Sequence, residues 1–414
     1  MSMVVTLGPR QDGGKGTDAA AVPRGRAPAR TVDQHVQGTS RIWTGRTGTL
    51  PAVLPPRTRN LHTPMSTPSS PITAQSPASS RMQWMDLLRG MAVILVVILH
   101  AASIPTSTGS GIREWILTNR YLEPFRMPLL MFLSGMLLPR SLAKPLPQYL
   151  WGKYAAIVWP AAVWMVLYGV FVYRNGPFEL SYWITGDYLW FLLALIICYT
   201  LAALLQKLPF LLVSAAMMAA VVLVEVPSGL PHKTLYYGAF FFLGAWACRY
   251  MDRWLRAPWM LVVAMAVVAA VFSHLGREDL ALRMGTWQAA GISLLGLGVI
   301  LWLAPRLPRG MISAFFEWAG RSSIVVYVAH FPILVVIHRV LARMEVAPIW
   351  HVGITTVLGL ALTLLMVWLR PWTTWLYVYP RQKQVATRLK ERAARQKSAP
   401  AATPTPGATP DVGR

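Results

Sequence analysis

The chain has 414 residues, of which 55% are hydrophobic and only 13% are charged, and its mean hydropathy is +0.44. Soluble domains carry about 25% charged residues, so this chain cannot cover a water-facing surface of its own and lipid must cover much of it. The formal net charge of +23 does not indicate a nucleic-acid partner, because the excess lies in the termini and in alternate loops rather than on one folded face.

Residues 1–80 are rich in Pro, Gly, Ser, Thr, Ala and Arg and show almost no apolar periodicity. This composition predicts a disordered basic extension. No apolar run of about 7–15 residues follows the basic start, so the segment does not resemble a secretory signal. Met65 and Met82 could each be the true first residue.

Ten apolar runs follow at close intervals, and we predict that each forms a transmembrane helix. They define an all-α, polytopic membrane domain over residues 81–380. The expected spans are 84–103, 122–138, 154–173, 188–205, 209–226, 234–250, 257–274, 287–304, 320–342 and 351–377.

The Lys and Arg residues of the short loops predict orientation, because cytoplasmic loops are enriched in them. The richer set of alternate loops holds Arg140, Lys144, Lys153, Lys207, Arg249, Arg253, Arg256, Arg306, Arg309 and Arg321. The poorer set holds Arg113, Arg120, Arg174, Lys233, Arg277, Arg283 and Arg343. We therefore expect the richer set and both termini on the cytoplasmic side of a bacterial inner membrane.

Residues 381–414 form a basic tail. We expect a short basic helix candidate at its start and disorder over the tail as a whole, which would lie against anionic lipid at the cytoplasmic face.

The first span carries three ionisable residues, Asp86, Arg89 and His100. At about 100° per residue, Arg89 and His100 differ by roughly 20° in direction and about 16 Å in height on a helix. Asp86 lies one turn from Arg89 on nearly the same stripe. One helix face therefore carries an ion-pair candidate near its cytoplasmic end and an imidazole deep toward the other side.

Ionisable residues at membrane depth are costly and usually serve a function. The alternative is a structural Asp86–Arg89 pair at the interface and a histidine that hydrogen-bonds a neighbouring helix. For the acid–base pair alone the two interpretations are balanced. For a histidine aligned with them we favour function, because histidine exchanges protons near neutral pH.

Several other residues are weaker candidates. His330, which follows Tyr327 inside a span, either orients a substrate or satisfies a neighbouring helix. His338 and His351 fall near the ends of their spans and are expected to be solvated.

Two further features of the apolar runs favour packing over chemistry. Trp190 could line an acyl site, although tryptophan in an apolar run is more often an anchor. Ser134-Gly135 favours close helix contact over a nucleophile. Cys198 and Cys248 have no metal-ligand spacing, so no metal is expected.

Four stretches resemble, in order, the membrane-bound acyltransferase-3 family. They are Asp86-Leu-Leu-Arg-Gly with His100, Phe125-Arg-Met-Pro-Leu-Leu-Met-Phe-Leu-Ser-Gly-Met-Leu-Leu138, Tyr188-Leu-Trp-Phe-Leu-Leu-Ala-Leu195, and Glu317-Trp-Ala-Gly-Arg-Ser-Ser-Ile-Val-Val-Tyr-Val-Ala-His330. The resemblance covers residues 84–377.

The resemblance implies ten spans, a cytoplasmic acyl-CoA donor and an extracytoplasmic hydroxyl acceptor. It implies that His100 is the catalytic base and that Arg89 serves donor binding or activity. Because CoA is strongly anionic, we expect its head at a basic mouth built from Arg89, Arg140, Lys144 and Lys153. The donor is a substrate, and no bound cofactor is expected.

The chain departs from the family pattern at two places. The family often has an Arg-rich motif before the third span, where this chain has Lys153 at one basic position and Ala156 at the other. The family often has a histidine before Trp190, where this chain has Asp187-Tyr188-Leu189. Both departures bear on the CoA contacts more than on His100.

The main alternative is a transporter or flippase that uses the buried His and Arg as a relay. It predicts repeated halves with broken helices, and no such repeat is visible. A structural scaffold would leave the Arg89–His100 stripe unexplained. The acyl group is expected to be acetyl or longer, and the acceptor is a cell-envelope glycan, a glycolipid or an exported small molecule.

Overall fold

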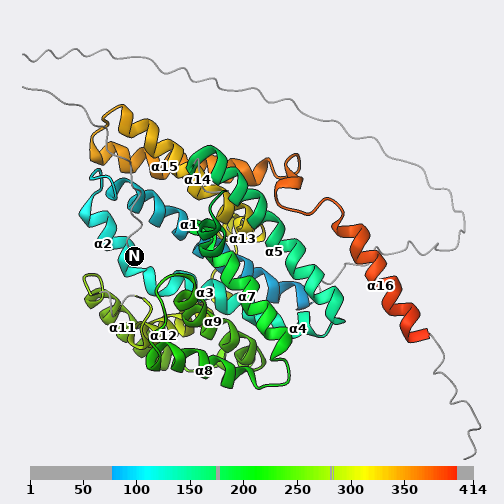
Figure 1. The fold of residues 1–414 in the computed structure, drawn as a ribbon. Helices are drawn as coiled ribbons and strands as arrows, with labels where there is room; N and C mark the ends of the chain where they lie inside the picture. Colours follow the sequence, from blue (N-terminus) through cyan, green and yellow to red (C-terminus); the bar gives the residue numbers. More distant parts are fainter. Residues whose placement is uncertain (1–76, 174–177, 280–281, 283, 399–414) are drawn as a thin grey trace, which may run out of the picture. The chain divides into compact units, whose positions relative to one another are not determined.

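The computed structural model describes residues 77–173, 178–279, 282 and 284–398, and every regular element in these ranges is a helix. The predicted all-α class is therefore confirmed (Figure 1). Residues 1–76 of the predicted extension, 1–80, lie outside the described residues. Arg174 and Arg283 lie outside them as well.

Each of the ten expected spans overlaps one principal helix. These helices are α1 (Pro77–Thr106), α3 (Glu123–Met136), α5 (Leu146–Tyr168), α7 (Trp190–Leu204), α8 (Phe210–Leu223), α9 (Leu230–Ala247), α11 (Trp259–Leu275), α12 (Trp287–Leu303), α14 (Ser323–Arg343) and α15 (Pro348–Trp368).

Among the described residues, six helical segments are long and apolar enough to cross a membrane, which makes the chain a multi-pass membrane protein. They are Gln83–Thr106, Leu146–Tyr173, Leu180–Leu204, Trp287–Arg306, Ser323–Arg343 and Pro348–Trp368. Helices α8 and α11 are apolar but shorter. The count of ten crossings and the cytoplasmic placement of the termini stay predictions.

The structure corrects the expected spans at the C-terminal end of the domain. The expected span 351–377 is too long, because α15 ends at Trp368. Pro371 follows closely, and proline disfavours helical backbone in the residue before it. The expected span 320–342 begins instead with the end of a separate helix, α13 (Met311–Arg321).

Short helices that the apolar pattern did not predict fill several connections. They are α2 (Arg113–Tyr121), α4 (Leu138–Leu142), α6 (Leu180–Thr185) and α10 (Met251–Trp254). The tail is not disordered throughout. The basic helix expected at its start is present as α16 (Gln382–Ser398), which packs against α5.

Helix α1 lies at the centre of the contacts and packs against α2, α3, α13, α14 and α15. Its crossing with α13 is a close one. A Cβ at Gly90 would overlap the carbonyl oxygen of Phe316, and a Cβ at Gly320 would overlap that of Asp86. Small residues allow such backbone contact between membrane helices, so these two glycines set the position of Asp86.

A second glycine crossing joins α3 and α9. A Cβ at Gly135 would overlap the carbonyl oxygen of Phe241, and one at Gly244 would overlap that of Phe132. The expectation that Ser134-Gly135 serves close helix contact is therefore confirmed for the glycine. Ser134 Oγ donates to the carbonyl of Leu130 at 2.8 Å, within its own helix.

We predict that Gly320→Ala lowers the free energy of unfolding by about 1–3 kcal/mol, the usual cost of overpacking. The matched control is Gly152→Ala on α5, where an added Cβ meets nothing within 4 Å. This control should be neutral or stabilising by up to about 1 kcal/mol, because alanine favours the helix. Thermal unfolding in detergent measures both, and equal melting temperatures would contradict the close crossing.

Candidate active site

The expected ion pair is present on α1. Arg89 Nη1 lies 3.4 Å from Asp86 Oδ1, and the two side chains are 18% and 20% exposed. Arg89 Nη2 also donates to the carbonyl of Leu133 on α3 at 3.3 Å. The guanidinium therefore joins the carboxylate of its own helix to the backbone of a neighbouring one.

Leu133 lies in the last turn of α3, where carbonyl oxygens lack partners within the helix. The next carbonyl, that of Ser134, accepts a hydrogen bond from the hydroxyl of Tyr199 on α7 at 3.5 Å. A helix C-terminus carries partial negative charge and favours cations nearby. The C-terminal end of α3 therefore favours positively charged side chains nearby.

Lys153 on α5 is brought to the same place. Its Nζ lies 4.0 Å from the ring centroid of Tyr199, a cation–π contact. The positive charges of Lys144 and Arg89 both act on it. Arg89, Lys144 and Lys153 are hereafter called the basic cluster, and three of the four predicted donor-binding cations belong to it.

Arg140, the fourth predicted donor-binding cation, and Trp190, the candidate for an acyl site, lie differently. Arg140, on α4, is an exposed residue. Trp190 begins α7, nine residues before Tyr199, which corresponds to about 14 Å along a helix. The Nζ of Lys233 lies 4.7 Å from the Trp190 ring centroid, and the Tyr237 ring lies 5.2 Å away. The structure therefore does not bring Trp190 to the basic cluster.

His100 faces His330 across the α1–α14 contact. Their ring centroids are 5.3 Å apart, and Phe331 packs edge-on against His100 at 5.2 Å. His100 is half-buried, whereas His330 is buried at 1% exposure. We call these two residues the histidine pair; His330, which sequence reasoning left undecided, thus lies beside the predicted base.

The hydrogen bonds of His330 define its tautomer. Its Nδ1 lies 2.6 Å from the carbonyl oxygen of Tyr327. A carbonyl can only accept, so Nδ1 carries the proton and Nε2 of the neutral ring is an acceptor. Nε2 is buried and has no hydrogen-bond partner among the described residues, which leaves one lone pair available beside His100.

Tyr327 also holds the segment before α7. Its hydroxyl donates to the carbonyl of Tyr188 at 2.9 Å, and the Tyr188 hydroxyl donates to the carbonyl of Val328 at 3.0 Å. The Tyr188 ring stacks on Phe331 at 5.1 Å. Tyr327 therefore supports the wall around the histidine pair, and its own hydroxyl is already committed.

Sequence reasoning missed Arg126 on α3, which is buried at 2% exposure. Its guanidinium donates to the carbonyl of Leu95 on α1 at 3.1 Å and to that of Asn119 on α2 at 2.7 Å. Its charge acts on His100. The signal was available, because a charge four residues into the expected span 122–138 is costly unless it is used.

The expectation that His338 and His351 are solvated is wrong. They are 7% and 0% exposed, and His338 Nδ1 lies 2.9 Å from His351 Nε2. His338 Nε2 lies 3.3 Å from Thr108 Oγ1. Because α14 and α15 form an antiparallel pair, two histidines thirteen residues apart in sequence meet between the helices. Both side chains are therefore buried from solvent.

The direction of this chain of hydrogen bonds follows from Thr108. Its hydroxyl donates to the carbonyl of Pro105 at 2.9 Å, so it accepts from His338 Nε2–H. His338 Nδ1 must then accept from His351 Nε2–H. The chain ties α15 and α14 to the segment that follows α1.

A family model described as "Acyltransferase domain" (Acyl_transf_3) matches residues 82–368. The match begins just before Asp86 and ends at the last residue of α15. The chain belongs to the acyltransferase-3 family. The predicted resemblance is therefore confirmed, and this family member is a membrane acyltransferase. No curated protein matches the chain, and no solved structure matches it.

The acyltransferase-3 match encloses the basic cluster, the histidine pair and Arg126. Asp86 and Arg89 occupy one end of the α1 stripe, and His100 lies eleven residues away toward the other end. Among the residues that the structure describes, no three His, Cys, Asp or Glu side chains are placed to hold a metal ion.

For this acyltransferase we predict that His338→Leu lowers the free energy of unfolding by about 1–3 kcal/mol, because it leaves a buried donor of His351 unpaired. The double variant His338→Leu/His351→Leu should recover part of this loss, since replacing both partners by apolar groups is close to neutral. Thermal unfolding of the two single variants and the double variant measures the coupling. Strictly additive losses would contradict the hydrogen bond.

Proposed function

We propose that this membrane acyltransferase transfers an acyl group, acetyl in the simplest case, from acyl-CoA to a hydroxyl of an acceptor on the opposite side of the membrane. One observation carries the proposal. Helix α1 carries Arg89, a member of the basic cluster, at one level and the half-buried His100, with a second imidazole beside it, at another.

The basic cluster is the donor end of the site. CoA carries several phosphates, and Arg and Lys are the side chains that bind them. Arg89 presents a planar guanidinium, whereas Lys144 and Lys153 present point charges. We place this end at the cytoplasmic face, where the loops carry more Lys and Arg. Both termini, the exposed Arg140 and the basic tail belong to that side.

The reacting end is the histidine pair. His100 lies about 16 Å from Arg89 along the helix, a distance that the narrow pantetheine arm of CoA covers. The acceptor approaches His100 from the other face. His100 is half-buried, so a substrate can reach it, and histidine is the commonest general base near neutral pH.

The acceptor oxygen bonds to the acyl carbon of the thioester, and the carbon–sulfur bond breaks. The proton of the hydroxyl goes to His100 and from there to the departing thiolate, which leaves as free CoA. The ester leaves on the acceptor, and the protein ends in its starting state.

His330 and Arg126 support this step without entering it. His330 Nε2 is an acceptor beside His100 and orients either the His100 ring or the incoming hydroxyl. Arg126 sets the position of α1 near His100 through the carbonyl of Leu95 and supplies a fixed positive charge near the developing negative charge of the transition state.

We predict that purified protein in nanodiscs releases free CoA from acetyl-CoA when an envelope extract supplies the acceptor. His100→Ala should reduce the rate by at least a hundredfold, the scale of general base catalysis. The exposed His274→Ala is the control and should keep the wild-type rate. Longer acyl-CoAs define the chain length. Release that persists in His100→Ala, or no release together with solute transport, would refute the proposal.

We further predict that Lys153→Gln raises the KM for acyl-CoA about tenfold with little change in kcat. One charge-assisted hydrogen bond contributes about 1.5–3 kcal/mol, and part of it is recovered from the other cations. Lys207→Gln, in the exposed loop between α7 and α8, is the control. A fall in kcat at unchanged KM would instead assign Lys153 to the chemical step.

A further inference from the structure

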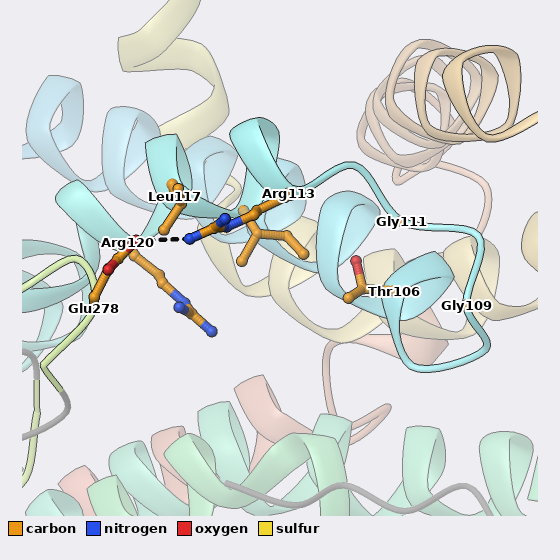
Figure 2. A pocket seen from close by; sticks show the side chains of 8 residues that line it. Thr106, Gly109, Gly111, Arg113, Leu117, Arg120 and Glu278 are labelled. Atoms are coloured by element: carbon orange, nitrogen blue, oxygen red, sulfur yellow. Dashed lines mark hydrogen bonds and ion pairs between the residues drawn. The ribbon is translucent and has the colours of Figure 1, made fainter.

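A cavity of about 410 Å³ lies at the Thr106 end of α1. Its wall includes Thr106, Gly109 and Gly111 from the end of α1 and the loop after it, and Arg113 and Arg120 from α2. Glu278, from the segment after α11, closes the far side. Figure 2 shows Arg113 reaching toward Glu278, with the glycine loop beside Thr106. Ile116 and Leu117 add an apolar patch.

The shape of the loop depends on its glycines. Gly109 has a φ of +83°, a backbone conformation that favours glycine. A Cβ at Gly111 would overlap the side chain of Thr106. Thr108, directly before Gly109, contacts the buried His338. The loop is therefore an anchored wall of the α1–α2 cavity.

The charges of the cavity favour an anion. Arg113 Nη2 lies 3.0 Å from Glu278 Oε1, but the two side chains are 74% and 67% exposed. Ion pairs this exposed stabilise a protein little, so an incoming anion can replace Glu278. Arg120 donates to the carbonyl of Arg277 at 3.3 Å, and a guanidinium has five N–H donors.

The N-terminal end of α2 adds to the positive potential of the cavity. The helix begins at Arg113, and its N-cap residue Ile112 makes no side-chain cap. Uncapped amides of a first turn carry partial positive charge. Glu114 lies in the same turn but is exposed and outside the lining. The two arginines and the helix start together outweigh Glu278, the one carboxylate among the described residues of the wall.

We propose that the α1–α2 cavity binds an anionic group of the acyl acceptor, a carboxylate or a phosphate, with Arg113 and Arg120 as its ligands and Glu278 as the group it displaces. This inference rests on the proposed function. Thr106 follows His100 by six residues, about 9 Å along the helix. An acceptor held by its anion in the cavity would have to extend at least this far along α1, about one or two sugar rings, to bring a hydroxyl to His100.

The charge of the acceptor is tested by direct binding with three probes that share one sugar ring: glucose 1-phosphate, glucuronate and glucose. Saturation-transfer NMR on the full-length protein in nanodiscs of deuterated lipid measures each. We expect one or both anions to bind and glucose not to bind. A preference for glucose 1-phosphate assigns a phosphate-bearing acceptor, and a preference for glucuronate assigns an acidic glycan.

Variants locate the binding. Arg113→Gln/Arg120→Gln should weaken binding of the preferred anion at least tenfold, and Glu278→Gln should strengthen it severalfold. Arg343→Gln, at the end of α14, is the matched control. Equal binding of the anion by the wild-type protein and the double arginine variant would overturn the assignment of the α1–α2 cavity as the anion-binding site. Because this readout needs no acyl transfer, its failure is separate from loss of His100-dependent CoA release.

The kinetic arm links the cavity to the reaction. With an acceptor that the wild-type protein acylates, the double arginine variant should raise the acceptor KM at least tenfold and leave the KM for acyl-CoA unchanged. An unchanged acceptor KM would overturn the role of the cavity in acceptor binding, even if the anion binds there.

Discussion

The last turn of α3 determines where the positive charges of the candidate site lie. Its carbonyl oxygens at Leu133 and Ser134 have no partners within the helix and accept from Arg89 and Tyr199. The following residue, Gly135, brings α9 against the same turn. Three consecutive residues thus hold a guanidinium, a phenol and a neighbouring helix. The ammonium group of Lys153 in turn makes a cation–π contact with the Tyr199 ring.

Helix α7 separates two cationic sites. Lys153 lies on Tyr199 near one end, and Lys233 lies on Trp190 at the other. An aromatic face attracts a cation without supplying a counter-charge. The histidine pair lies away from both, beside Tyr327 and Phe331. The site is therefore polar at its ends and aromatic around the imidazoles.

Local spacing was enough to predict part of this arrangement. The three-residue interval places Asp86 against Arg89, and the apolar runs place the ten main helices. Helix α13 was missed because its residues are mixed in character, and its packing depends on two glycines far apart in sequence. Tyr199 and Arg126 were missed because their partners are backbone carbonyls of other helices, which leave no mark on composition. The burial of His338 and His351 likewise depends on how α14 meets α15.

The bond between Thr108 and His338 has a thermodynamic consequence. Helix α14 carries His338 near one end and His330 two turns earlier, so the same helix contacts both the glycine loop and His100. A ligand that shifts the loop must either give up this hydrogen bond or move α14. Coupling between two sites is reciprocal in free energy. A ligand at the loop that moves α14 would therefore change affinity at the imidazoles by the same factor as a ligand at the imidazoles changes affinity at the loop.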